Sequence, residues 1–508
     1  MPPCGRLVLA PATSPGADTI LTSCRFGSLL LAAAIAAVPR LASSQTKESG
    51  SAGPRLASTT LIPEWHTPVG KRLPCPDCEP PQRFWAAAGE LMLAQAIPWG
   101  ITRYVRDGEW ARITPKTWID NLKFPWQWDN NKFNNNQFAH PYHGSLYYNA
   151  ARTNGYNFWQ SAPWAFAGSL MWELFGEVWA PAPNDLANTT LGGITLGEML
   201  FRFSTLTLKN EASGSNRVVR EVGAALINPV QGFNRLVRGE SGRISETPPD
   251  WRPSQIQTSM DVGYRRFATS ASLNDPDARD QTFVQFSVFY GNLLEDVGRA
   301  PFSTFQVSGM LASRSENHRA LQELRVRGNL AAKPLGSGSS KRLAAFMTYE
   351  YLSNPVVDFG AQGFQGGLIY AQSKLPKEMR LSGEAMVRMN PIAAIRSDYF
   401  VTAEGRDYDY GVGLGGNVAG RAEWPGKATV RLGGGYVFLP VLSGFPGNHH
   451  LFTLTTEARG YYRGKYGFGV VYNRLWRRSN YTFNPDVDED MSEARVFLSL
   501  AIPRWGVE

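Results

Sequence analysis

Apolar and polar residues alternate along the chain from Ser254 to its last residues. The final stretch shows the pattern clearly, with Val496, Leu498 and Leu500 at positions that alternate with Arg495 and Ser499. Successive side chains of a β-strand point to opposite faces of the sheet, so a period of two predicts strands with one apolar and one polar face. The second half of the chain is therefore expected to be built from β-strands.

Twelve such stretches can be recognised, beginning near residues 257, 282, 303, 320, 341, 362, 378, 408, 427, 449, 465 and 491. An even number of strands is typical of a bacterial single-chain membrane barrel. The connections are tight at 374–377, 424–426 and 463–465 and long at 390–407, 439–448 and 476–489. Outer-membrane barrels place short turns on the periplasmic side and long loops outside. Residues 293–302 do not fit this scheme, because they are too many for a tight turn.

A soluble β-sandwich or β-propeller would also alternate. Aromatic residues near the strand ends and the lack of a blade repeat favour the membrane barrel. We therefore expect an α+β fold, in which an N-terminal helical domain (83–245) precedes a C-terminal antiparallel transmembrane β-barrel of about 12 strands (254–508).

The polar face of a membrane barrel looks into its lumen. That face would carry Asp261, Arg265, Glu323, Arg325, Arg327, Glu350, Arg380, Glu384, Arg388, Arg431, Glu457, Arg459, Glu493 and Arg495. Opposite charges at alternate positions predict internal ladders of ion pairs, as expected of a narrow barrel. The functional alternative is a pore or ligand cavity whose basic bias suits anions.

The N-terminus carries features of export. Residues 27–38 (GSLLLAAAIAAV) form a short apolar core that follows Arg25 and precedes small residues near Ser44. This layout predicts a secretory signal peptide (1–44), followed by a flexible linker (45–82) rich in Ser, Gly, Pro and Thr. The net charge of +8 is spread over the chain and forms no basic tract, so nucleic-acid binding is not expected.

Cys75 and Cys78 are the two cysteines that remain after removal of such a signal. In an exported chain this pair predicts a local disulfide. A redox motif or half of a metal site is the alternative, although no second cysteine pair accompanies it.

The helical domain combines dense aromatics with polar residues between His140 and Arg202. Glu173 and Glu177 are four residues apart, which would place them on one face of a helix among tryptophans and phenylalanines. Asp185 and Arg202 belong to a second polar stripe, and a hairpin through Pro181 could pair Arg202 with one of the two glutamates.

Three interpretations of this polar cluster stay open. It could be a buried network of satisfied hydrogen bonds, because buried charges persist only when they are paired. It could be a polar helical surface at the membrane interface. It could also be a catalytic site, with candidates Glu173, Glu177, Asp185, His143 and Arg202, or a metal site formed by His140, His143, Glu173 and Glu177. No cofactor can be assigned.

Four stretches carry a family resemblance: HPYHGSLYYNAAR, GYNFWQSAPWAFAGSLMWELFGE, NDLANTTLGG and ALINPVQGFNRL. Through them, residues 115–240 resemble the bacterial envelope family called domain of unknown function 3943. The resemblance implies an envelope protein of Gram-negative type and supplies no activity.

We therefore expect an outer-membrane barrel protein with a periplasmic helical domain that gates, plugs or docks on the periplasmic mouth. Its expected role is envelope structure or transport through a pore. The alternative is a membrane-embedded enzyme that modifies lipids or glycans with the polar cluster. The barrel class implies outer-membrane lipid and the barrel-assembly machinery as partners.

Overall fold

The computed structural model describes residues 81–248, 251–270, 272–292, 300–313, 320–336, 340–354, 357–372 and 375–502. The expected signal peptide, the linker up to Pro80 and the Cys75–Cys78 pair lie outside these residues.

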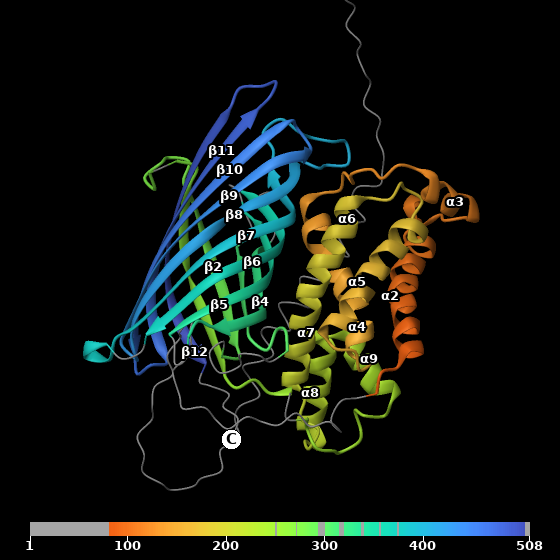
Figure 1. Ribbon diagram of the computed structural model, residues 1–508, viewed down its shortest axis with the longest axis horizontal. Coiled ribbons are helices and arrows are strands. Elements are labelled where there is room, and N and C mark those ends of the chain that lie inside the picture. The colour runs from red at the N-terminus through yellow and green to blue at the C-terminus, as the bar shows by residue number, and fades with distance from the viewer. Residues whose placement is uncertain are drawn as a thin grey trace, which may run out of the picture.

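The first part of the described chain is a bundle of helices (Figure 1). Its α-helices are α2 (Phe84–Tyr104), α3 (Pro115–Lys123), α4 (His140–Arg152), α5 (Phe158–Met171), α6 (Pro183–Ala187), α7 (Gly193–Thr207), α8 (Gly214–Ile227) and α9 (Pro229–Val237). A short 3₁₀ turn, η3 (Glu109–Ala111), follows α2. Side chains define several starts: Asn157 and Gln160 form a capping box at α5, and Asn228 caps α9. Among the described residues, none of the helices has both the length and the apolarity needed to cross a membrane.

Helix α4 is the centre of the bundle and packs against α5 and α7. It approaches the start of α7 at backbone distance, because a Cβ atom on Gly144 would lie 1.8 Å from the carbonyl oxygen of Thr189. Two adjacent glycines, Gly192 and Gly193, are a pattern that often interrupts a helix. Instead, the π-helical turn η6 (Asn188–Gly192) leads directly into α7. These glycines permit close packing and do not end the helix.

The second part is a closed antiparallel barrel in which every strand pairs with its sequence neighbours and β1 pairs with β12. Its strands are β1 (Ile256–Ala268), β2 (Arg279–Tyr290), β3 (Phe305–Ala312), β4 (Leu321–Pro334), β5 (Lys341–Ser353), β6 (Asp358–Gln372), β7 (Arg380–Arg396), β8 (Tyr408–Trp424), β9 (Ala428–Ser443), β10 (Gly447–Tyr462), β11 (Tyr466–Tyr481) and β12 (Val487–Ile502). The expected number of strands is confirmed. The largest offsets are at β6 and β12, which begin at Asp358 and Val487 rather than near 362 and 491.

The long connections were predicted less well. Strands β9 and β10 are joined through residues 444–446, not by a long loop over 439–448. Strand β9 passes through Pro440, which has no N–H to donate to the ladder, and Pro440 still pairs with Asn448. At the described end of the connection between β2 and β3, the carbonyl oxygen of Pro301 accepts a hydrogen bond from Arg202 of the helical bundle at 3.3 Å.

The two faces of the barrel wall differ as expected. Leu498 faces outward and is 69% exposed, whereas its neighbour Ser499 faces inward and hydrogen-bonds Asp261. Inward charges pair across strands: Arg459 with Asp261 at 3.0 Å, Arg327 with Glu384 at 2.7 Å, Arg388 with Glu350 at 2.7 Å, and Arg265 with Glu493 at 3.2 Å. The predicted ion-pair ladder is therefore confirmed.

One level of the lumen is apolar instead. Inward side chains from seven strands and one turn form a buried cluster, which we call the lumen layer: Phe267, Val357, Phe359, Ala361, Ala393, Ile395, Val437, Leu439, Leu451, Leu475 and Met491. Inward residues can be buried only where other atoms fill the lumen beside them. Side chains therefore fill the barrel at this level.

The helical bundle packs against the outside of the barrel wall and runs beside the strands in Figure 1. Glu350 faces the lumen, so its neighbours Tyr349 and Tyr351 face outward. Both tyrosines are nevertheless buried, because they contact the bundle residues Gln137 and Phe133. The expectation that the helices gate, plug or dock on the periplasmic mouth is therefore wrong, because the described helices contact the outer face of the barrel wall.

The packing of the bundle on the barrel wall can be tested by a substitution at Gly360. Gly360 faces outward on β6 opposite Tyr351, and a Cβ atom on it would lie 2.3 Å from Oε1 of the buried Gln137. We expect Gly360→Val to weaken docking by about 1–3 kcal/mol through overpacking. Limited trypsin digestion should then cut between the bundle and β1 faster than in the wild type, while the barrel stays folded.

Gly366 provides the matched control on the same strand. It opposes Ala345, and the nearest atom to its Cβ position is 3.9 Å away. Gly366→Val should leave the digestion pattern unchanged. Equal digestion of both variants would contradict the docking geometry.

Candidate functional site

Gln137 holds the bundle to the wall through three hydrogen bonds. Its carbonyl oxygen accepts from the Tyr349 hydroxyl at 2.7 Å. Its side-chain amide donates to the Tyr410 hydroxyl at 3.2 Å and accepts from Gln362 at 3.3 Å. All four residues are buried. Neutral amides and hydroxyls suit this place because they avoid the cost of burying charge.

Three further asparagines extend this contact, which we call the tyrosine–amide interface. Asn136 donates to Tyr408 at 2.8 Å, and Asn184 and Asn188 both donate to Tyr410 at 3.4 Å. Tyr408 and Tyr410 begin β8, so the interface lies near the loop that joins β7 to β8.

A group of acids, which we call the carboxyl cluster, lies directly behind this interface: Asp129, Glu173, Glu177 and Asp185, together with His140. Asn184 links the two, because its amide nitrogen also donates to Asp185 at 2.7 Å and its oxygen accepts from the Asp129 backbone at 2.9 Å. The His140 ring lies 3.8 Å from Asp185 and 3.1 Å from the Thr189 hydroxyl.

Three π-helical turns hold the cluster. They are η4 (Asn135–Ala139), η5 (Trp172–Gly176) and η6. A π turn shifts all following side chains around the helix axis and is common at functional sites. Glu173 lies within η5, where the backbone N–H of Ala182 donates to its carboxyl at 2.8 Å.

Three carboxyl groups of the cluster, those of Glu173, Glu177 and Asp185, have raised pKa values and keep their protons to unusually high pH. Burial, with Asp185 nearby, raises the pKa of Glu173 to about 8. Burial also raises the pKa values of Glu177, which is close to Glu173, and of Asp185. Burial lowers the pKa of His140, so its ring is favoured in the neutral form. Protonated carboxylic acids of Glu173, Glu177 and Asp185 therefore lie beside the neutral imidazole of His140.

The structure unites only some of the predicted site residues. Glu173, Glu177, Asp185 and His140 come together. Glu173 and Glu177 do not share one helix face, because η5 intervenes and Glu177 has an extended backbone. Among the described residues there is no group of three or more His, Cys, Asp or Glu side chains that could hold a metal ion.

His143 lies next to the cluster without a contact to its carboxyl groups: its ring is 3.0 Å from the carbonyl oxygen of Ala94, packs against Trp172 and is 3.1 Å from the Tyr147 hydroxyl. Arg202 lies apart from the cluster, and its expected pairing with Glu173 or Glu177 is wrong. It binds Glu198, one turn away on its own helix, at 2.8 Å. Arg152 binds the same carboxylate at 2.8 Å. Burial alone would raise the pKa of Glu198, but these two guanidinium groups hold it below its usual value.

Sequence reasoning missed a second polar chain, which lies inside the barrel. Asp409, His449 and Ser479 come from β8, β10 and β11, and the His449 ring lies 3.0 Å from Asp409 and 2.8 Å from Ser479. All three side chains are fully buried, and Arg477 donates to Ser479 at 3.0 Å. The three residues are far apart in the sequence. The only sequence signal for them was that each stands at an inward-facing position of the alternating pattern. This hydrogen-bonded chain therefore links β8, β10 and β11 inside the barrel.

Two of the hollows formed by the described residues lie on the barrel, and carboxyl-cluster residues line neither. One is an apolar groove of about 1020 Å³ on the wall between β4 and β9, lined by small residues together with Leu343, Val387 and Val418. The other, about 110 Å³, is lined by inward residues including Arg327, Glu384 and Arg421.

Residues 125–230 match the model of a family described as Domain of unknown function (DUF3943). The match confirms the resemblance over a central segment. It contains every member of the carboxyl cluster and all the bundle residues of the tyrosine–amide interface. No curated protein matches the chain.

Several solved outer-membrane proteins are similar to the barrel half. The NanC porin is 11% identical over 47% of this chain and 98% of its own, with a TM-score of 0.27. An outer membrane channel from Pseudomonas putida F1 is 12% identical over 51% and 100%, with a TM-score of 0.24. An anion-selective porin from Comamonas acidovorans is 9% identical over 48% and 98%, with a TM-score of 0.23. The function must be argued from the chain's own geometry.

The pKa of Glu173 predicts a pH-dependent stability. The folded protein keeps this proton up to about pH 8, whereas an unfolded chain releases it at the ordinary carboxyl value. The contribution of Glu173 to the free energy of unfolding is therefore fully present at low pH, below the pKa of the unfolded chain. Above that pKa it declines by about 1.4 kcal/mol per pH unit until the pH reaches the folded pKa. Urea unfolding in detergent, followed by tryptophan fluorescence, should give lower midpoints at pH 8 than at pH 5.5.

Glu173→Gln should reduce this slope, because an amide can still accept from Ala182 and has no proton to lose. The matched control is Asp107→Asn, which changes an exposed acid. A slope that is the same in wild type and Glu173→Gln would contradict a protonated, buried Glu173.

Proposed function

We propose that this protein is a structural component of the outer membrane, in which a sealed barrel anchors the helical bundle. The lumen layer is the observation that carries this proposal. Its buried apolar side chains come from β1, β6, β7 and β9 to β12, including Phe267 on β1, Phe359 on β6 and Leu475 on β11. An ion or polar solute would have to lose its water to pass them.

Polar contacts next to the layer reinforce the seal. Arg477 on β11 reaches the end of β7, where it donates to the Arg396 carbonyl at 3.1 Å and pairs with Asp398 at 2.6 Å. The ion-pair ladder occupies inward positions elsewhere along the strands. These contacts favour an envelope-structure role over transport through an open pore.

The proposed orientation follows from the chain path. The bundle leads from α9 into the start of β1, and the turns at 425–427 and 463–465 lie at that same end of the barrel. Short turns mark the periplasmic side of outer-membrane barrels. The α8–α9 end of the bundle is thus periplasmic, as an exported chain inserted by the barrel-assembly machinery requires, and the carboxyl cluster lies toward the opposite end.

The carboxyl cluster favours a second candidate function, a lipid- or glycan-modifying enzyme. Glu173 is protonated near neutral pH, as a general acid must be, and the partly exposed Glu177 and His140 lie at the edge of the cluster. If this function is present, Glu173→Gln should assemble normally yet leave the cell's lipid or glycan profile like that of a deletion strain. A profile identical to wild type would exclude it.

The sealed barrel makes a direct electrical prediction. Wild-type protein in planar lipid bilayers should show no sustained conductance, because the lumen layer excludes ions. Truncating two of its large side chains, as Phe359→Ala with Leu475→Ala, should open a path and produce conductance steps. The control is Leu498→Ala, which shortens an outward side chain and should stay closed. Porin-like conductance of the wild type would contradict the proposal.

A further inference from the structure

Helix α2 presents an apolar face to the surroundings on the side of the bundle away from the barrel (Figure 1). Between Phe84 and Thr102 its only charged residue is Glu90. Leu93 and Ile97, one turn apart, are 46% and 57% exposed, and Trp85 is 84% exposed. Exposed apolar side chains on one continuous face mark an interaction surface.

The polar residues of α2 point the other way and are satisfied. Buried Glu90 accepts from Asn154 and Asn234, both at 2.8 Å. Gln95 donates to the carbonyl oxygen of Gly168 at 3.1 Å. The bundle therefore fixes which face of α2 is left outside, and that face is apolar.

The position of the bundle on the barrel wall determines what surrounds the apolar face of α2. The strand that carries the covered Tyr349 also carries Leu343, which faces outward and is exposed. The exposed Met389 and Leu414 likewise lie on the strands β7 and β8 that the bundle covers farther along. The bundle thus takes the place of lipid along part of an apolar wall.

The dimensions and ends of α2 fit a bilayer. A helix of 21 residues is about 31 Å long, close to the roughly 30 Å of a hydrocarbon core. Aromatic rings stand near both ends, Trp85 at the start and Tyr104 at the finish, and Arg83 and Arg106 lie just beyond them. Aromatic and basic residues at such positions are typical of the two membrane interfaces.

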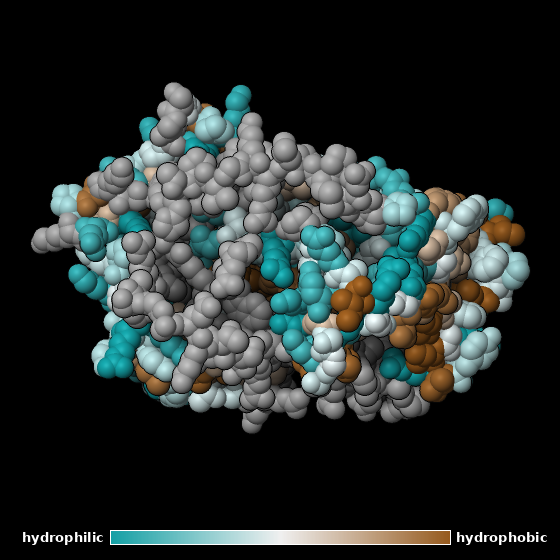
Figure 2. Space-filling model, turned by 90° about the horizontal axis from the view of Figure 1, so that it is seen from below, coloured by the Kyte–Doolittle hydropathy of each residue, from teal (hydrophilic) through white to brown (hydrophobic). Residues whose placement is uncertain are grey.

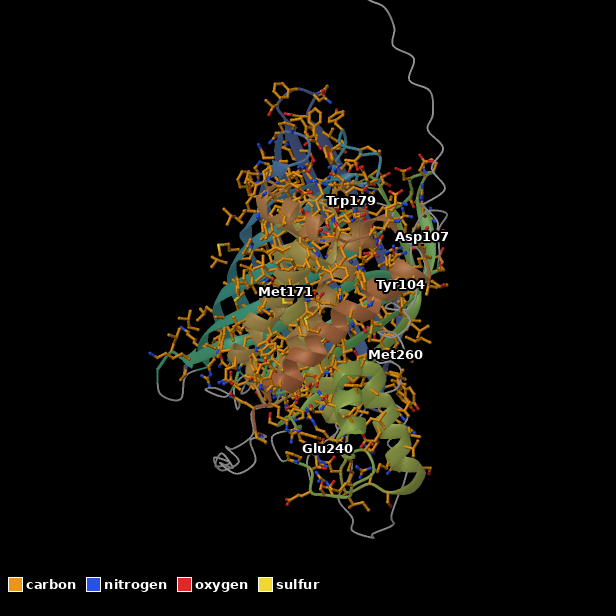
Figure 3. All side chains as sticks on the ribbon, turned by 90° about the vertical axis from the view of Figure 1, so that its right-hand side faces the viewer. Tyr104, Asp107, Met171, Trp179, Glu240 and Met260 are labelled. Atoms are coloured by element: carbon orange, nitrogen blue, oxygen red, sulfur yellow. The ribbon has the colours of Figure 1, made fainter. Side chains whose placement is uncertain are left out.

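The other surfaces of the bundle agree with this placement. Figure 2 shows brown, hydrophobic atoms gathered on the helical side of the end in view. The exposed apolar residues of the helices that follow in the chain include Val219 and Val222 on α8 and Leu236 on α9. Figure 3 looks onto the bundle, with Tyr104 and Asp107 toward the upper end and Glu240 near the lower end.

We propose that the helical bundle is embedded in the outer membrane beside the barrel, with the outer face of α2 in contact with lipid acyl chains. Lipid meets only one side of α2, and the bundle satisfies the other. This inference is independent of the role proposed above, because the bundle could be embedded in the membrane whether the protein is a sealed anchor or an enzyme.

Photocrosslinking tests the contact in the full-length protein. p-Benzoylphenylalanine is placed at Leu93 or, in a second variant, at Ile97, and the protein is reconstituted into vesicles of phosphatidylethanolamine and phosphatidylglycerol. Heat-modifiable gel mobility confirms that each barrel is folded. After irradiation we expect both proteins to gain the mass of one phospholipid. The same group at Asp107, beyond the end of α2, should give no such gain.

Three results would overturn the proposal. The first is the lack of a lipid adduct at both positions in folded protein, and the second is an adduct at Asp107 as abundant as those on α2. The third is crosslinking of Leu93 and Ile97 to a protein in place of lipid, which would make this face a contact with another chain.

Discussion

The contact between Gln137 and the barrel wall is the interaction on which the rest of the structure depends. One side chain and its backbone carbonyl engage Tyr349, Gln362 and Tyr410 from three strands. Gly360 leaves room for the glutamine, because any side chain there would collide with it. This contact fixes the bundle on the outer face of the wall, and described inward side chains of the barrel form the lumen layer.

The same contact explains where the acids lie. Asn184 joins Tyr410 to Asp185, so the carboxyl cluster is an extension of the docking interface. Acids so close together are tolerated in a buried place because they keep their protons, as Glu173 does up to about pH 8. Docking of the bundle and protonation of the cluster are therefore coupled, and rising pH weakens the bundle from within this interface.

The barrel could be predicted from the sequence because alternation is local, and a residue such as Asp261 shows its face through its neighbours. The docking could not, because outward tyrosines such as Tyr408 look the same whether lipid or a helix covers them. The carboxyl cluster was predicted in part: Glu173 and Asp185 were recognised, but the π turns that set their directions have no clear sequence signal. The partner of Arg202 was missed because only Glu173 and Glu177 were considered as its partners, whereas the acid that binds it is Glu198, one turn away on the same helix.

Oxidative crosslinking between Gln137→Cys and Gly360→Cys tests the lateral docking most directly. A Cβ atom at Gly360 would lie 2.7 Å from Cγ of Gln137, so two cysteines at these positions have the closeness that a disulfide needs. In intact outer membranes we expect this pair to form a disulfide that shifts the protein's mobility on a non-reducing gel, whereas Gln137→Cys with Gly366→Cys should not. Failure of the first pair to crosslink in a folded barrel would contradict the account.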